Sequence, residues 1–75
     1  MKIKVGTILK IKFLEDDTID TVMIIKDITG GYDWKYMILD LQTKEVLRNF
    51  KTLEEIKNKS NIVKVVGQFD ELFSI

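Results

Sequence analysis

Residues Trp34–Phe50 read WKYMILDLQTKEVLRNF, and this segment predicts a β-hairpin around which the rest of the chain can be placed. Its two arms, residues 36–39 and 46–50, are rich in apolar and β-favouring residues and contain neither Pro nor Gly. The polar group Gln42–Lys44 separates the arms at the spacing of a hairpin loop. We therefore expect the two arms to pair as antiparallel strands.

The length of the loop sets the register of this hairpin. With a three-residue loop, the expected pairs are Leu39 with Leu47, Ile38 with Arg48, and Tyr36 with Phe50. Lys44 then falls where such a loop places a left-handed residue. One face should belong to the core: Tyr36, Ile38, Val46 and Phe50. The other face is also too apolar for water, and the N-terminal strand, the C-terminal tail or another molecule should cover it: Met37, Leu39, Leu41 and Leu47.

Two more strands are predicted before the hairpin. Residues 2–14 form the first, with Ile3, Val5, Leu9, Ile11 and Phe13 on one side and Lys2, Lys4, Lys10 and Lys12 on the other. Gly6 and Thr7 interrupt the alternation and indicate a bulge or bend. Residues 19–29 are nearly continuously apolar, which favours a central strand with both faces covered, ended by Gly30 and Gly31.

The hydrophobic period changes after Phe50. Thr52 and Glu55 have the spacing of a capping box, which predicts a helix of about two turns that lays Leu53 and Ile56 on the sheet. Residues 62–66 predict a last strand ended by Gly67. The apolar tail, residues 68–75, suits either a helical turn or an extended edge segment.

Five strands with a short helix between the fourth and fifth predict a mainly β, SH3-like small barrel in which residues 1–75 form a single domain. The segment YMILDLQTKEVLRNFKTLEEI, followed by NIVKVV, resembles small SH3-like β proteins of phages and prophages of low-GC Gram-positive bacteria. The resemblance covers about the last two-thirds of the chain. It implies a phage accessory protein, a class that includes inhibitors of host enzymes and antagonists of host defence, and it transfers no functional residue.

Composition excludes several classes of function. The 75 residues carry 12 basic and 12 acidic side chains, so no overall field draws the chain to nucleic acid or to an anionic membrane. Neither Cys nor His occurs, which removes disulfides, thiolate sites and the usual general base and metal ligand. No run is apolar for the roughly 20 residues of a membrane span. We expect a cytoplasmic protein, in the host cytoplasm if a phage encodes it, without catalytic residues, cofactor or metal.

Charged residues suggest two sites, each with a simpler explanation. The cluster Glu15, Asp16, Asp17 and Asp20 could bind a hard cation, but it lacks the pattern of a calcium loop, and a solvated turn is favoured. The lysine face could contact phosphates through Lys2, Lys4, Lys10 and Lys12. A solvated strand face is favoured there as well, because Arg48 is the only Arg and the net charge is zero.

Aromatic and apolar residues suggest partner contacts. Tyr32 and Trp34 beside the Gly30-Gly31 turn could grip a peptide or stack on a base, or they could cap the end of the barrel. The tail could fold back as core or leave an exposed apolar patch for a partner or a second copy of the chain. The candidate partner-binding residues are Tyr32, Trp34, Phe69, Leu72 and Phe73.

The leading hypothesis is a non-enzymatic binding protein that occupies a surface of a host protein and so inhibits or modulates it. One alternative is a small barrel that binds nucleic acid through the lysine face. Another is a homo-oligomer that sequesters a small ligand such as a nucleotide between protomers, because one barrel of this size has little interior room.

Overall fold

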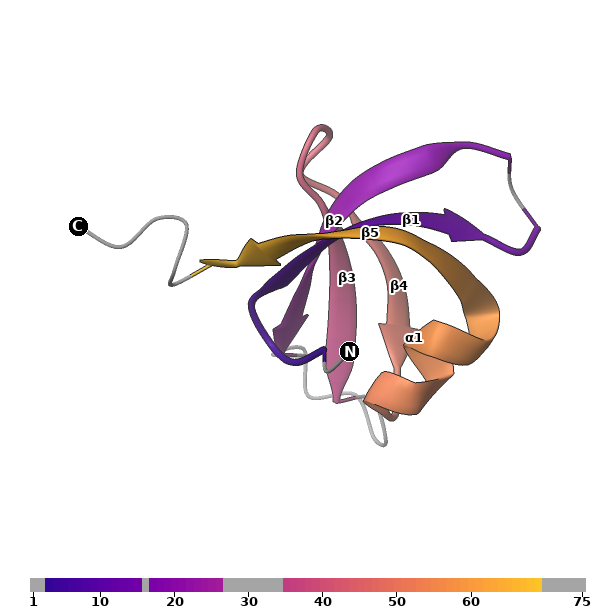
Figure 1. Ribbon diagram of the computed structural model, residues 1–75. Helices are drawn as coiled ribbons and strands as arrows, with labels where there is room; N and C mark the ends of the chain where they lie inside the picture. The colour runs from indigo at the N-terminus through magenta and orange to yellow at the C-terminus, as the bar shows by residue number, and fades with distance from the viewer. Residues whose placement is uncertain (1–2, 16, 27–34, 70–75) are drawn as a thin grey trace.

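The computed structural model describes residues 3–15, 17–26 and 35–69. Six elements follow one another along the chain (Figure 1): β1 Thr7–Phe13, β2 Ile19–Lys26, β3 Tyr36–Asp40, β4 Val46–Phe50, α1 Leu53–Lys59 and β5 Ser60–Gln68. The prediction of a mainly β chain, with five strands and a short helix between the fourth and fifth, is confirmed.

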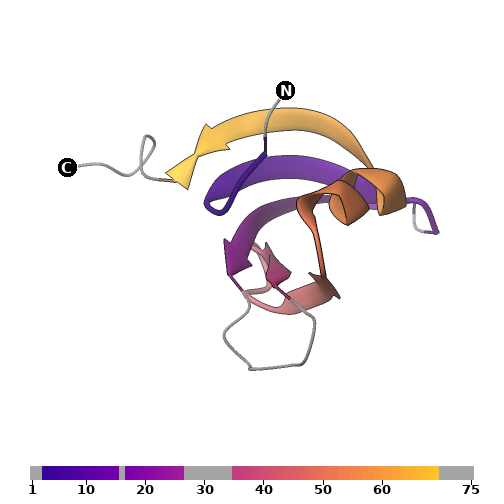
Figure 2. The same ribbon diagram turned by 90° about the horizontal axis from the view of Figure 1, so that it is seen from below.

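All five strands belong to one antiparallel sheet in the order β4-β3-β2-β1-β5. The sheet curls so that its end strands, β4 and β5, approach a common opening, and α1 lies in that opening (Figure 2). We call this opening the mouth. The closed barrel predicted from the sequence is not what the described residues form, because α1 occupies the position in which β4 and β5 would have to pair.

The core lies on the inner face of the curled sheet. Its largest fully buried side chains come from all of β1 to β4 and from α1: Leu9, Ile11, Val22, Ile24, Ile38, Phe50 and Ile56. Each side chain of this kind contributes about 1.5–3 kcal/mol when it leaves water. β2 lies between β1 and β3, as its nearly continuous apolar sequence predicted.

The hairpin pairs Tyr36 with Phe50 and Ile38 with Arg48 as predicted, but Leu39 pairs with Val46 and not with Leu47. An irregularity between Ile38 and Leu39 shifts the register. As a result Val46, predicted in the core, is 44% exposed, and Leu47, predicted on the opposite face, packs against the core. Both predictions are therefore wrong.

The turn of the hairpin explains this shift. Asp40 N donates to Glu45 O (2.8 Å), so the loop contains four residues, 41–44, and is one residue longer than the predicted loop. The buried Asp40 carboxylate accepts hydrogen bonds from Gln42 N (2.8 Å) and Thr43 N (3.1 Å), which fixes the turn from inside. The extra turn residue displaces the register of the following strand.

Lys44 has a φ of 66°, which confirms the left-handed residue predicted at this position. In a residue with a Cβ, this conformation raises the free energy of the folded state by about 1–2 kcal/mol. Lys44→Gly should therefore unfold at higher urea concentration than Lys44→Ala, with a difference of about 1 kcal/mol in the free energy of unfolding. Both variants lose the hydrogen bond from Lys44 Nζ to Leu41 O (2.6 Å), so their comparison isolates the backbone. Equal stability of the two variants would refute this explanation.

A tight turn precedes β1 and contains Gly6, whose φ is +92°. Gly6 N donates to Ile24 O (2.7 Å), and Gly6 O accepts from Phe69 N (2.8 Å), so the turn is bonded both to β2 and to the residue that follows β5. Ile3 is buried as predicted. Val5 is 45% exposed, which contradicts its predicted place in the core, because the turn ends the alternation before β1 begins.

The side chain of Gln68 fastens this turn to the end of β5. Gln68 Nε2 donates to Val5 O (2.7 Å), and Gln68 Oε1 accepts from the buried Thr7 hydroxyl (2.8 Å). The Thr7 hydroxyl oxygen also accepts from Lys4 N (3.0 Å). We call this network the Gly6 clasp. It holds Gln68, the last residue of β5, against the turn that precedes β1.

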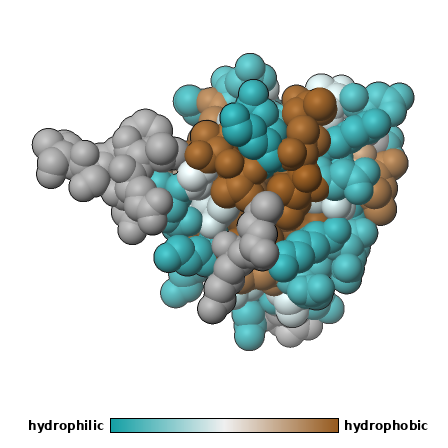
Figure 3. All heavy atoms as spheres, in the orientation of Figure 1, coloured by the Kyte–Doolittle hydropathy of each residue, from teal (hydrophilic) through white to brown (hydrophobic). Residues whose placement is uncertain are grey.

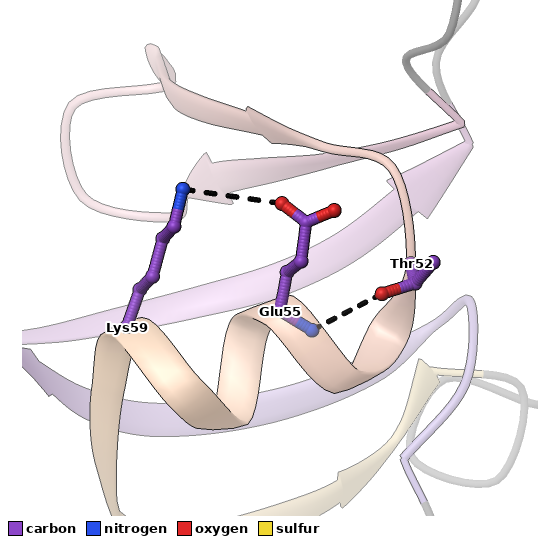
Figure 4. Close-up of polar contacts among 3 residues, drawn as sticks. All are labelled: Thr52, Glu55 and Lys59. Atoms are coloured by element: carbon purple, nitrogen blue, oxygen red, sulfur yellow. Dashed lines mark hydrogen bonds and ion pairs between the residues drawn. The ribbon is translucent and has the colours of Figure 1, made fainter.

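Helix α1 starts at the predicted cap. Thr52 Oγ1 accepts from Glu55 N (3.2 Å), as Figure 4 shows. The Glu55 side chain does not complete a capping box but lies 3.9 Å from Lys59 Nζ one turn further along the helix. Leu53 and Ile56 pack into the core as predicted, so the cap holds the segment that fills the mouth.

Thr52→Ala should lower the free energy of unfolding by about 1 kcal/mol, because one amide of the first turn loses its acceptor. Thr52→Ser keeps a hydroxyl at this position and serves as the control. Urea denaturation of the three proteins measures the effect, and an alanine variant as stable as the serine variant would contradict it.

Candidate binding surface

Three large apolar side chains on β5 and directly after it are exposed, and we call them the β5 patch: Val63, Val66 and Phe69. These side chains are 53%, 40% and 48% exposed, respectively. Apolar atoms gather over the middle of the face shown in Figure 3, where Figure 1 draws β5, and hydrophilic atoms surround them. Phe69 belongs to the predicted set of partner-binding residues.

Two bulges in β5 produce this exposure. Along β1, Ile11 pairs with Ile62 and Lys10 with Lys64, so Val63 lies between two pairs and opposes no residue. The same happens at Val66, since its neighbours Val65 and Gly67 pair with Leu9 and Ile8. A bulge leaves its extra residue outside the ladder and redirects the side chain. Both valines are therefore turned away from the core by the backbone itself.

The sequence contained a weak signal for these two valines. Residues 62–66 read IVKVV, and four apolar residues among five cannot all face the core from one strand with alternating sides. The predicted strand ended before Gly67, whereas β5 runs through it to Gln68. This extension brings the strand to the Gly6 clasp, and Gly6 O then anchors Phe69 through the Phe69 amide.

The other four predicted partner-binding residues lie outside the described residues, as does Lys2: Tyr32, Trp34, Leu72 and Phe73. Within the acidic cluster, Asp16 also lies outside, Asp17 Oδ1 is 3.5 Å from Lys12 Nζ, and Glu15 forms an ion pair with Arg48. Among the residues that the structure describes, no group of three or more acidic side chains is placed to hold a metal ion.

Lysines do lie along β1, but the set of neighbouring lysines differs from the predicted one. Lys10 lies opposite Thr21 on one side and Lys64 on the other, and both lysines are exposed. Lys4 lies apart from them, in the turn before β1. The prediction missed Lys64, because only the pairing of β1 with β5 brings this residue beside Lys10.

Lys64→Glu should stabilise the domain, because like charges directly opposite each other destabilise a sheet and opposite charges stabilise it by roughly 0.2–1 kcal/mol. We expect a gain of about 0.5–1 kcal/mol in urea denaturation at low ionic strength, which 1 M salt reduces. Lys64→Gln should give a smaller gain. A loss of stability in Lys64→Glu would show that Lys10 and Lys64 do not repel each other.

A hollow of about 330 Å³ opens at the mouth and is lined by Arg48, Asn49, Phe50 and Lys59. Arg48 to Phe50 come from β4, and Lys59 is the last residue of α1. The Arg48 guanidinium lies over the ring of Phe13, 4.4 Å from its centre. Two cationic side chains from different elements, β4 and α1, therefore border one small cavity.

No family model, curated protein or solved structure matches the chain. The resemblance to SH3-like phage proteins thus rests only on the segments quoted above. Over residues 3–15, 17–26 and 35–69, the structure contains no helix of the length and apolar character that crossing a bilayer requires.

Proposed function

We propose that this domain is a non-enzymatic binding protein that acts by occupying the surface of another protein with the β5 patch. The observation that carries the proposal is the pair of bulges that turn Val63 and Val66 outward on an end strand of the sheet. Bulges cost ladder hydrogen bonds and often lie beside functional sites. The ladder between β1 and β5 is interrupted at two exposed valines. Such an arrangement is more typical of a contact surface than of a strand with a purely structural role.

The composition of the β5 patch and its surroundings supports this proposal. An apolar centre with a charged rim is the usual arrangement of protein interfaces, and aromatic residues carry much of their binding energy. Val63 and Val66 supply part of an apolar centre, and Phe69 adds an aromatic ring. The absence of His and Cys from the whole sequence further favours binding over catalysis.

The biological setting that the sequence resemblance implies forms part of the proposal. The domain would be a phage or prophage accessory protein with an SH3-like origin that inhibits or modulates a host protein, in host takeover or anti-defence. It would act in the host cytoplasm. The same patch could be covered by a second copy of the chain, which makes the oligomeric state part of the test.

Affinity capture from host lysate tests the proposal with matched variants. The double variant Val63→Asp/Val66→Asp places two charges on the β5 patch, and Leu14→Asp places one at a 63% exposed residue after β1. Wild type and Leu14→Asp should retain the same specific protein, and the double variant should lose it while keeping the wild-type circular dichroism spectrum. Identical capture by all three proteins, or no specific protein with wild type, would contradict the proposal.

A second function, binding of nucleic acid, is favoured only by the adjacent Lys10 and Lys64. It predicts binding of single-stranded DNA or RNA that weakens steeply with salt, and a loss of binding in Lys64→Gln. No mobility shift at low ionic strength would remove this alternative.

A further inference from the structure

The hollow at the mouth combines the guanidinium of Arg48 with a second cation, the ammonium group of Lys59. Arg48 is the only Arg of the chain, and its planar group has donors arranged to match a carboxylate. The ring of Phe13 supports one face of this group (4.4 Å), so the guanidinium is held in place before any ligand arrives. Lys59 faces the same cavity from the end of α1.

A carboxylate of the protein itself already contacts this guanidinium. Glu15 forms an ion pair with Arg48 through one oxygen and one terminal nitrogen. The Glu15 side chain is 65% exposed and belongs to the turn that follows β1, where no strand pairing holds it. Exposed ion pairs of this kind are weak, so another carboxylate can replace Glu15 at little cost.

The ammonium group of Lys59 is also available to a ligand, because its own ion pair is long and exposed. Its Nζ lies 3.9 Å from Glu55 Oε2, which is long for a charge-assisted hydrogen bond, and the Lys59 side chain is 58% exposed. A small movement would bring the ammonium group toward the cavity that Lys59 lines. A volume of about 330 Å³ lies at the lower end of the range for ligand pockets and holds one side chain or a similarly small group.

We propose that the hollow binds the carboxylate of an Asp or Glu side chain on a protein partner, in exchange for the Glu15 carboxylate. Arg48 supplies the oriented donors, and Lys59 adds the second charge. This deepens the proposed function, on which it rests, by assigning an acidic contact to the partner. Glu15 then acts as an internal competitor that keeps the site occupied until a partner is bound.

An NMR titration of the purified domain tests this exchange. The probe is the capped tripeptide acetyl-Gly-Glu-Gly-amide, and the control ligand is its Gln counterpart. The Glu peptide should shift the Arg48 Nε–H and the Asn49 and Lys59 amide resonances with millimolar affinity, and the Gln peptide should leave them unchanged. Equal shifts with both peptides, or none with either, would overturn the proposal. Tighter binding of inorganic phosphate than of the Glu peptide would also overturn it, in favour of a phosphate site.

Three variants separate exchange from a purely structural ion pair. Glu15→Gln should bind the Glu peptide about two- to five-fold more tightly, the factor that corresponds to loss of one exposed ion pair. Lys59→Gln should weaken binding, and Lys57→Gln, an exposed lysine of the same helix that does not line the hollow, should not. Unchanged or weaker binding by Glu15→Gln would refute competition at Arg48.

This titration is independent of the β5 patch. The double variant Val63→Asp/Val66→Asp should bind the Glu peptide as tightly as wild type, even though we expect it to lose the captured partner. If the hollow fails to bind the peptide while capture still depends on the β5 patch, only the carboxylate site is wrong. If the peptide binds but capture does not depend on the patch, only the proposed docking surface is wrong.

Discussion

Ile56→Ala should lower the free energy of unfolding by about 2–5 kcal/mol, the largest effect that we expect from a single substitution outside the sheet. Ile56 is fully buried and lies on the helix that occupies the mouth, where no strand can take its place. A domain of this length has a total stability of roughly 4–11 kcal/mol. Loss of one helix side chain should therefore remove a large share of the stability.

Urea denaturation followed by circular dichroism measures this effect, and Leu14→Ala provides the control. Leu14 is 63% exposed, so its truncation should change the free energy of unfolding by no more than about 0.5 kcal/mol. If Ile56→Ala were as mild as Leu14→Ala, α1 would not be closing the core. The sheet would then have to be stable with its mouth open.

Gly6→Ala should cost roughly 3–4 kcal/mol through two separate effects. A Cβ at residue 6 would lie 2.6 Å from Gln68 Nε2, so Gln68 would have to move and give up its hydrogen bonds to Val5 O and the Thr7 hydroxyl. Two such bonds are worth about 1 kcal/mol each. The φ of +92° adds about 1–2 kcal/mol for a residue that carries a Cβ.

A double-mutant cycle separates these two effects. In a Gln68→Ala background the collision is absent, and Gly6→Ala should cost only the backbone share, about 1–2 kcal/mol. Urea denaturation of the wild type, the two single variants and the double variant gives the coupling free energy. Strict additivity would show that Gln68 does not fasten the turn as described.

The local patterns of the sequence predicted much of the fold. Capping by Thr52, the central position of β2 and the pairing of Ile38 with Arg48 follow from neighbouring residues alone, and all three are present. The prediction of a closed barrel was wrong, because closure depends on whether β4 and β5 pair with each other. Helix α1 lies between β4 and β5 and contacts both, and the sequence pattern of neither strand indicates this.

The candidate site was harder to predict than the fold. Val63 and Val66 are exposed because β5 bulges against β1, and a bulge arises from the fit between two strands far apart in the sequence. The hollow requires Arg48 of β4 and Lys59 of α1 to line the same cavity, and only the folded chain brings these two elements together. Val46 was misplaced because the Asp40 side chain closes a turn one residue longer than expected.

Site-specific photocrosslinking tests whether the domain contacts its partner through the β5 patch. A benzoylphenylalanine introduced at residue 66 should crosslink one host protein in living cells, whereas the same group at the exposed residue 14 should not. Equal crosslinking from both positions, or a crosslinked partner at residue 14 alone, would contradict the claim.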